Sequence, residues 1–251
     1  MFNKFIPGLF ALISLINGFD IYAQDIGTCK SNMLYARSYI TDTKHIVKAP
    51  LKWKPAQFAA AGLLVGGVML LTQYDTQIAD WVQQHKSPAS HRVSRIIEPL
   101  GNELVVLGGS AALCSFGLLT NKKNKTTFAG MQNIKTVLIS SAFIFGLKHL
   151  THRARPQMNQ GSNAWYPLSD RWDFTSFPSG HTTFAFATAT TLSQFSRKKI
   201  VPVIAYSIAA GVALSRIHDN KHWSSDVLAG AAIGTAFSLT INRGVKYSTA
   251  Y

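Results

Sequence analysis

Six apolar segments follow residue 55, and they constrain the fold of this chain more than any other feature. Each is close to the ~17 to 25 residues that a helix needs to cross a bilayer, and each is rich in small residues that let helices pack closely in lipid. The segments are 56–73, 104–120, 134–150, 182–195, 200–214 and 227–241. We expect an all-α, multi-pass helical membrane bundle of about six helices. The alternative is a soluble all-α protein with buried helices, because the shortest segments are borderline in length for a span.

The composition also favours a membrane protein. Hydrophobic residues make up 47% of the 251 residues and charged residues only 14%, whereas a soluble chain usually carries about 25% charged residues. The net charge is +14, but the basic residues gather in short clusters between apolar segments and not along one helix face. We therefore expect a membrane and phosphate esters as partners, and no nucleic acid. Cys29 and Cys114 offer neither a disulfide framework nor a metal-site spacing.

The basic loops between the segments predict which ends face the cytoplasm. By the positive-inside rule, clusters of lysine and arginine mark the cytoplasmic ends of membrane helices. The clusters are 121–125, 196–199 and 243–246, and the basic stretch 44–54 lies on the same side. The opposite ends hold the connections 74–103, 151–181 and 216–226. We expect these connections on the periplasmic face of a bacterial-type inner membrane.

The N-terminal residues give a conflicting signal. Residues 1–23 resemble a targeting leader, with Lys4 before an apolar stretch, and we expect cleavage after Ala23, with an uncleaved anchor as the alternative. If a leader carried the polar, basic segment 24–55 outward, three crossings would put the later connections in the cytoplasm, unless 56–73 does not span. We give the agreeing basic loops more weight, and we assign 56–245 to the helical domain.

The first of three polar motifs is KHLTHRARP at 148–156, at the end of the third apolar segment. Lys148 and Arg155 can hold the nonbridging oxygens of a phosphate, the arginine through its bidentate fork. Pro156 ends any helix at this point. The alternative is that the basic side chains only extend from a helix end to the lipid headgroups.

The second motif is PSGH at 178–181, immediately before the fourth segment. Free backbone N–H groups at a helix N-terminus form an anion site, and Gly180 allows close approach of a ligand. Ser179 adds a hydroxyl donor, and His181 could give a proton to a departing oxygen. The alternative is a serine that caps the helix beside an incidental histidine.

The third motif is SRIHDNKHWSSD at 215–226. Arg216 can complete a cationic site, while His222 and Asp226 have the four-residue spacing that places both on one face of a helix. Asp226 could accept a hydrogen bond from one ring nitrogen of His222 and leave the other free to attack phosphorus. The alternative is a solvated pair that caps a helix. His218 has no such partner, and we expect it to be structural.

Together, the order and spacing of these positions resemble the signature of the type 2 phosphatidic acid phosphatase (PAP2) superfamily. The resemblance implies that His222 is the nucleophile of a phosphohistidine intermediate, that Asp226 orients it, and that His181 is the general acid. It implies phosphate binding by Lys148, Arg155, Ser179, Gly180 and Arg216, with no metal and no cofactor, because the cations do the work of a magnesium ion.

Three branches of this superfamily remain open. The membrane branch resembles what the apolar segments predict, and it acts on phosphatidic acid, phosphatidylglycerol phosphate, undecaprenyl pyrophosphate or lipid A phosphates. The others are soluble acid phosphatases and vanadium haloperoxidases. We expect a membrane lipid phosphate phosphatase.

The loop 157–177 separates two of the motifs and is rich in aromatic residues. Trp165, Tyr166 and Trp172 suit either a lipid entrance or simple anchoring at the membrane interface. Arg171 could contact a second phosphate of a pyrophosphate or lipid A substrate. The sequence carries no signal for the oligomeric state.

Overall fold

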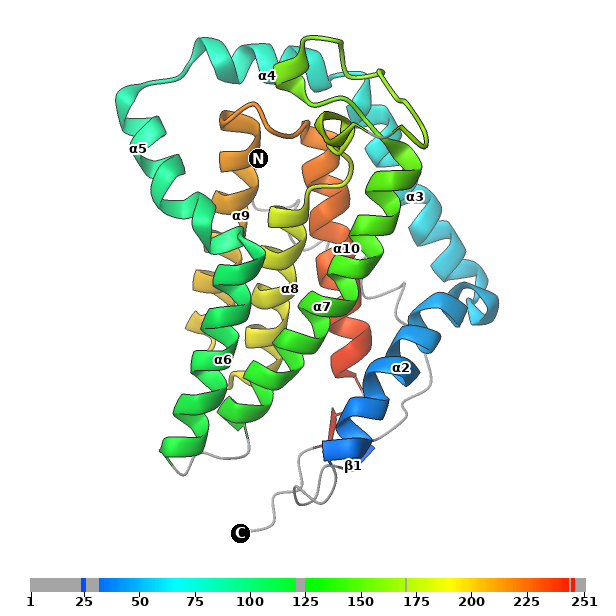
Figure 1. Ribbon diagram of the computed structural model, residues 1–251, viewed down its shortest axis with the longest axis vertical. Helices are drawn as coiled ribbons and strands as arrows, with labels where there is room; N and C mark the ends of the chain where they lie inside the picture. The colour runs from blue at the N-terminus through cyan, green and yellow to red at the C-terminus, as the bar shows by residue number, and fades with distance from the viewer. Residues whose placement is uncertain (1–23, 26–31, 121–124, 170, 244, 247–251) are drawn as a thin grey trace.

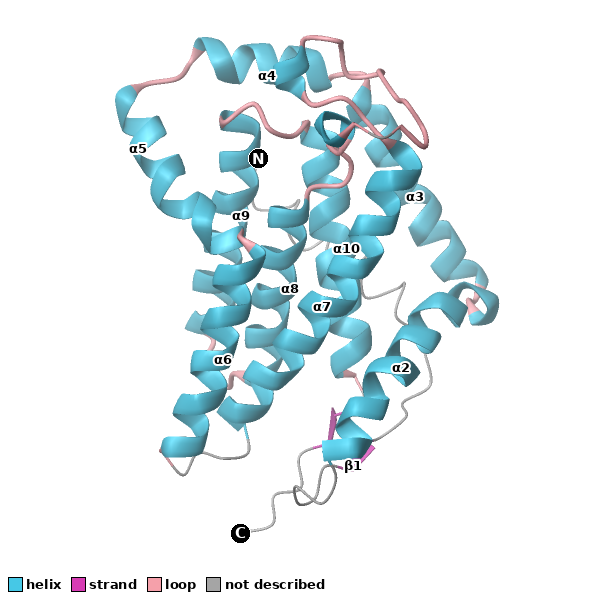
Figure 2. Ribbon diagram, viewed as in Figure 1, coloured by secondary structure: helices cyan, strands magenta, loops and turns pink. Residues whose placement is uncertain are grey.

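The computed structural model describes residues 24–25, 32–120, 125–169, 171–243 and 245–246, and Figure 1 shows a bundle of helices. The expected leader with its cleavage site after Ala23, and the basic residues 121–124, lie outside the described residues. The described part is helical except for its loops and one two-residue parallel pair, β1 (Gln24–Asp25) with β2 (Val245–Lys246) (Figure 2). The expected all-α class is confirmed.

Each of the six apolar segments forms a helix, as predicted. In chain order the helices are α3 (Pro55–Thr72), α6 (Glu103–Leu119), α7 (Lys125–Thr151), α8 (Gly180–Phe195), α9 (Ile200–His218) and α10 (Ser224–Asn242). By length and composition, four of them can cross a membrane, namely α3, α7, α9 and α10. A fifth span results if α6 is joined to 88–101, from which it is bent by 62°. The remaining helix, α8, has 16 residues, slightly fewer than a full span needs.

Large apolar side chains cover much of the outer surface of the bundle. Leu63, Met69, Phe116, Val203 and Leu214 are all more than half exposed, and they come from three different helices. Water-soluble monomers rarely expose so much apolar surface, whereas lipid-facing helices require it. The expected multi-pass membrane bundle is therefore confirmed, in preference to a soluble helical protein.

The longest helix, α7, begins nine residues before the apolar segment that predicted it, at Lys125. Its first turns contain polar residues that are buried and paired with other helices. Asn133 donates to Ser110 Oγ at 2.8 Å and to Thr188 Oγ1 at 3.0 Å, and Lys135 lies 2.6 Å from Asp42. Hydropathy alone underestimates the length of such a helix, because buried polar side chains are tolerated where they are hydrogen-bonded.

At the centre of the bundle, α8 packs against α7, α9 and α10. Two glycines of α10 allow the closest of these approaches. A Cβ atom on Gly230 would lie 2.5 Å from the Ser179 carbonyl oxygen, and one on Gly234 would lie 2.1 Å from that of Thr183. Small residues at such contacts let helix backbones touch in lipid. This packing fixes the N-terminus of α8 beside the N-terminus of α10.

The connections at one end of the bundle are themselves partly helical. Residues 74–103 form α4 (Asp75–Gln84), α5 (Pro88–Ile97) and η3 (Glu98–Gly101), where we expected only a connection. Ser87 starts α5 by accepting a hydrogen bond from the Ser90 N–H at 3.1 Å, and Pro88 occupies the first turn. Figure 1 shows α4 and α5 at the same end as the loop between α7 and α8.

The other short elements complete the description. They are α2 (Asn32–Lys48), η2 (Ala49–Lys52), η4 (Pro156–Met158) and η5 (Trp172–Phe174). Figure 1 places the last turn of α6 and the first turn of α7 at the end opposite α4 and α5.

Candidate active site

The eight predicted site residues meet at one end of the bundle, where the segment from Thr175 to His181 connects the three motifs. Lys148, in the last turn of α7, donates a hydrogen bond from Nζ to the Thr175 carbonyl oxygen. Arg155 Nη2 donates to Thr175 Oγ1 at 3.3 Å. Nδ1 of His222, in the loop between α9 and α10, lies 2.8 Å from the Ser176 carbonyl oxygen. The first and third motifs therefore converge on the residues just before the second.

His222 is buried, and its ring orientation is fixed by the main chain. A carbonyl oxygen only accepts, so the Nδ1 that faces Ser176 carries the proton and Nε2 keeps its lone pair. Burial, opposed by the nearby Asp226, lowers the pKa of His222 to about 3. The imidazole is therefore neutral near pH 7, as a nitrogen nucleophile must be.

Asp226 does not make the direct hydrogen bond with His222 that we expected. Its Oδ2 lies 3.7 Å from His222 Nδ1, too far for a hydrogen bond. The carboxylate instead accepts from the Ser176 hydroxyl and, at 2.9 Å, from the Trp223 N–H. Asp226 therefore caps the start of α10 and supports the segment whose carbonyl holds His222.

Two residues that the sequence reasoning did not select complete this support. Arg153 lies within the first motif and has no solvent exposure, with Nη1 2.6 Å from Asp226 and Nη2 2.8 Å from Asp75. Asp75, the first residue of α4, is equally buried and also accepts from the Ser225 N–H at 2.9 Å. A buried arginine at the end of an apolar segment requires carboxylate partners. The position of Arg153 in the sequence could therefore have indicated that acidic residues lie beside it.

Ser179 takes the capping position at the start of α8. Its hydroxyl accepts from the Thr182 Oγ1–H at 3.0 Å, and its N–H donates to the Asp226 carbonyl oxygen at 3.1 Å. A Cβ atom on Gly180 would contact only Phe184, at 3.6 Å. The helix therefore starts as the sequence predicts, and the space beside Gly180 is free of other protein atoms.

A third residue missed by the sequence reasoning, Glu98, joins His181 to Arg216. Its Oε1 lies 3.0 Å from His181 Nε2 and accepts a hydrogen bond from Arg216 Nη1. Glu98 is in η3, at the bend between α5 and α6, and its side chain is one-third exposed. No motif surrounds this position in the sequence, because only the bend of the chain brings the Glu98 carboxylate to the site.

The arginines of the site have donors that the protein does not use. Among the described residues, the Nε atoms of Arg155 and Arg216 are buried and make no hydrogen bond. Burial, together with the nearby charge of Arg216, lowers the pKa of Arg155. Unused buried donors and mutual repulsion of cations are both relieved by a bound anion. The arrangement therefore suits an anion such as phosphate beside His222.

The loop between α7 and α8 is packed by its own aromatic residues. The Trp165 ring lies 4.8 Å from the Arg153 guanidinium, and Tyr166 stacks on Phe174. Trp165 and Tyr166 remain more than one-third exposed, which is compatible with either of their expected roles; the side chain of Trp172 is not described. Arg171 is exposed and lies over Phe174, 3.8 Å from Asp173.

Comparison with known sequences identifies similar proteins. The model of the PAP2 superfamily matches residues 129–250. A lipid A 1-phosphatase of Porphyromonas gingivalis is 51% identical over 61 residues, which are 24% of this chain and 14% of that protein. A lipid A 1-phosphatase of Rhizobium johnstonii is 28% identical over 209 residues, covering 76% of this chain and 80% of that protein.

The fold is also similar to that of a solved structure. The crystal structure of a transmembrane PAP2 type phosphatidylglycerolphosphate phosphatase from Bacillus subtilis matches with a TM-score of 0.57 and 23% identity, over 71% of this chain and 92% of that one. Of the three branches left open by the sequence, these similarities support the membrane phosphatases.

Proposed function

We propose that this chain, which is similar to the membrane phosphatases of the PAP2 superfamily, hydrolyses a lipid phosphate at the site around His222. Two of the relatives are lipid A 1-phosphatases, and lipid A is therefore the first candidate among the expected substrates. The observation that carries the proposal is the pair of unused, buried arginine Nε donors beside a neutral histidine.

In the proposed first step, His222 Nε2 attacks the phosphorus atom. A P–N bond forms while the P–O bond to the lipid breaks, and His181 gives a proton to the departing lipid oxygen. The support for this assignment is the hydrogen bond from Nδ1 to the Ser176 carbonyl, which leaves the lone pair on Nε2. In the second step, water attacks the phosphohistidine, His181 takes its proton, and inorganic phosphate and free His222 result.

The remaining predicted residues bind the phosphate in this proposal. Lys148, Arg155 and Arg216 neutralise the charge that spreads over the nonbridging oxygens. Ser179 supplies its hydroxyl group and Gly180 its backbone N–H at the start of α8. No metal or cofactor takes part in the proposed step. Glu98 holds the His181 and Arg216 side chains in place before substrate binds.

We further propose that the site faces the periplasm. The support is that the motifs lie at the end of the bundle opposite the last turn of α6 and the first turn of α7, and that the sequence between these two helices is basic. This orientation leaves 24–54 in the cytoplasm, in conflict with a leader that would carry them outward. Cleavage after Ala23 therefore remains a prediction, and N-terminal sequencing of protein purified from membranes tests it.

Phosphate release by the purified protein in detergent tests the proposed function. The substrates are lipid A, phosphatidylglycerol phosphate, phosphatidic acid and undecaprenyl pyrophosphate. We expect the 1-phosphate of lipid A to be removed fastest, with His222→Ala inactive. His85→Ala, at an exposed histidine that follows α4, should leave activity unchanged. Absence of phosphate release from all four lipids, or full turnover by His222→Ala, would overturn the proposal.

A further inference from the structure

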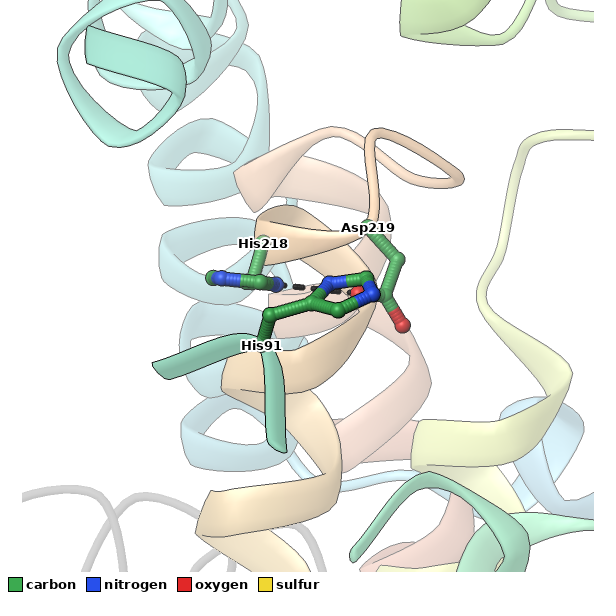
Figure 3. A group of neighbouring side chains, drawn as sticks. All are labelled: His91, His218 and Asp219. Carbon is green, nitrogen blue, oxygen red and sulfur yellow. Dashed lines mark hydrogen bonds and ion pairs between the residues drawn. The ribbon is translucent and has the colours of Figure 1, made fainter. Parts of the chain in front are cut away.

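Three metal-ligating side chains meet beside the candidate active site, where the third motif follows α9. His91 comes from α5, His218 is the last residue of α9, and Asp219 follows it. One ligand atom from each lies within 4.8 Å of the other two, and this is the one such group among the described residues. Figure 3 shows the His91 ring beside the Asp219 carboxylate and the hydrogen-bonding contact from His218 to Asp219.

The hydrogen bonds of Ser90 are compatible with the tautomer of His218 that carries its proton on Nε2. The Ser90 hydroxyl accepts from the Ser87 N–H, and it lies 3.0 Å both from the Ser87 carbonyl oxygen and from His218 Nε2. When its single hydrogen points to the Ser87 carbonyl oxygen, only a lone pair faces His218, and His218 Nε2 is the donor in this contact.

In this tautomer, a neutral His218 presents an unprotonated Nδ1 to a carboxylate. Nδ1 lies 2.9 Å from Asp219 Oδ1, which is itself an acceptor and already accepts from the Ser94 hydroxyl at 2.8 Å. Two acceptors face each other favourably only with a cation between them. That cation is either a second proton on the ring or a metal ion.

The position of His91 favours the metal. A proton would require only His218 and Asp219, whereas the His91 ring stands next to the pair with its centroid 6.0 Å from that of His218. Two imidazoles and one carboxylate form a ligand set typical of zinc, with water in the fourth position. We propose that His91, His218 and Asp219 bind a divalent transition-metal ion of the zinc class.

The geometry needs little change to accept the ion. Zinc–ligand bonds of about 2.0 to 2.1 Å in a tetrahedron separate the ligand atoms by roughly 3.4 Å, so the group must contract from at most 4.8 Å. His91 is exposed on α5, and its ring can turn if it leaves its contact with the exposed Arg95. Ser90 and Ser94 already hold His218 and Asp219 by the outer hydrogen bonds that orient metal ligands.

Two arginines limit the affinity of this site. Arg95 Nη2 lies 3.2 Å from His91 Nε2, and Arg216 Nη2 lies 3.3 Å from Asp219 Oδ2. Arg95 is exposed and can move into solvent, whereas Arg216 is buried. Repulsion by both charges predicts weaker binding than in structural zinc sites, and therefore an ion that exchanges.

Zinc binding to the full-length protein, purified in detergent without a histidine tag and stripped with a chelator, tests the proposal. Competition with a chromophoric chelator should give one zinc ion per chain for the wild type. We expect His91→Ala to bind at least about tenfold more weakly, because it removes a ligand and touches no proposed catalytic residue. The matched control is His85→Ala, at an exposed histidine that follows α4.

A second measurement separates loss of the site from loss of the fold. Zinc should raise the melting temperature of the wild type and of His85→Ala, but not that of His91→Ala, while all three melt alike without metal. Equal zinc affinity of wild type and His91→Ala, or no binding by the wild type, would overturn the proposal. No substrate is present, so the result is independent of phosphatase activity.

Discussion

Arg153 Nη1 lies 2.6 Å from Asp226 Oδ1, and neither side chain is exposed to solvent. The same guanidinium reaches Asp75 on α4, so one buried cation joins the first motif, the third motif and the helix that covers this end. The arginine and the two carboxylates stabilise one another, because burying an unpaired charge costs much free energy. This ion pair, more than the spacing of the motifs, positions Asp226 and the Ser176 segment that holds His222.

Removal of Arg153 should therefore destabilise the protein strongly. Arg153→Met leaves Asp75 and Asp226 buried without their cation, and we expect a loss of about 3 to 5 kcal/mol in the free energy of unfolding. Unfolding in mixed detergent micelles measures the loss. Arg92→Met, at an exposed arginine of α5, is the control and should change stability by less than about 0.5 kcal/mol. Similar stabilities of the two variants would contradict the buried charge network.

Replacement of Glu98 by glutamine should reduce turnover more than substrate binding. Glu98→Gln removes the carboxylate that faces His181 and Arg216, so the protonated form of His181 loses its stabilising charge. We expect kcat to fall by about 10²-fold, most strongly at high pH, while KM for the lipid phosphate stays equal or falls. The pH–rate profile measures both effects. Glu103→Gln, in the first turn of α6, is the control; a rise in KM at constant kcat would contradict this role.

The burial of His222 predicts a dependence of stability on pH. Its pKa is about 3 in the folded protein and about 6.5 when unfolded. Below pH ~6.5 the unfolded chain takes up a proton that the folded chain does not, so stability falls as pH falls toward 3. The slope from this group approaches about 1.4 kcal/mol per pH unit.

His222→Gln tests this dependence because glutamine does not titrate. Unfolding free energies of wild type and variant, measured at several values between about pH 6.5 and pH 4.5, should diverge with a smaller slope for the variant. Parallel curves would mean that His222 is accessible to protons in the folded state.

The contact between α8 and α10 should not tolerate a methyl group. Gly234→Ala places a Cβ atom 2.1 Å from the Thr183 carbonyl oxygen, so the helices must separate, and we expect a loss of about 1 to 3 kcal/mol in the free energy of unfolding. Gly66→Ala on α3 is the control, since a Cβ there meets no atom within 4 Å. Phosphatase activity should fall with Gly234→Ala only, because the contact also aligns the start of α8 with His222.

The sequence predicted the six apolar helices and the eight residues of the candidate site. Apolar length is a local property, and the residues of each motif lie close together in the chain, so both can be recognised without knowledge of the rest of the chain. The expected helical pairing of His222 and Asp226 was wrong, because His222 lies in the loop before α10. The residues at helix ends, including Ser179 before α8, were likewise predictable because capping depends on neighbouring residues. Whether those eight residues perform the assigned roles stays a prediction.

The tertiary structure decided the contacts that join distant segments. The sequence did not indicate that the Ser176 carbonyl, and not Asp226, receives the hydrogen bond from His222, nor that Asp75 and Glu98 reach the site from the connection before α6. Their partners lie far away in the chain, and such pairings depend on how α4, α5 and the bend at η3 fold over the bundle. Local patterns fix which residues can do chemistry, whereas only the packing of the helices fixes which atoms face one another.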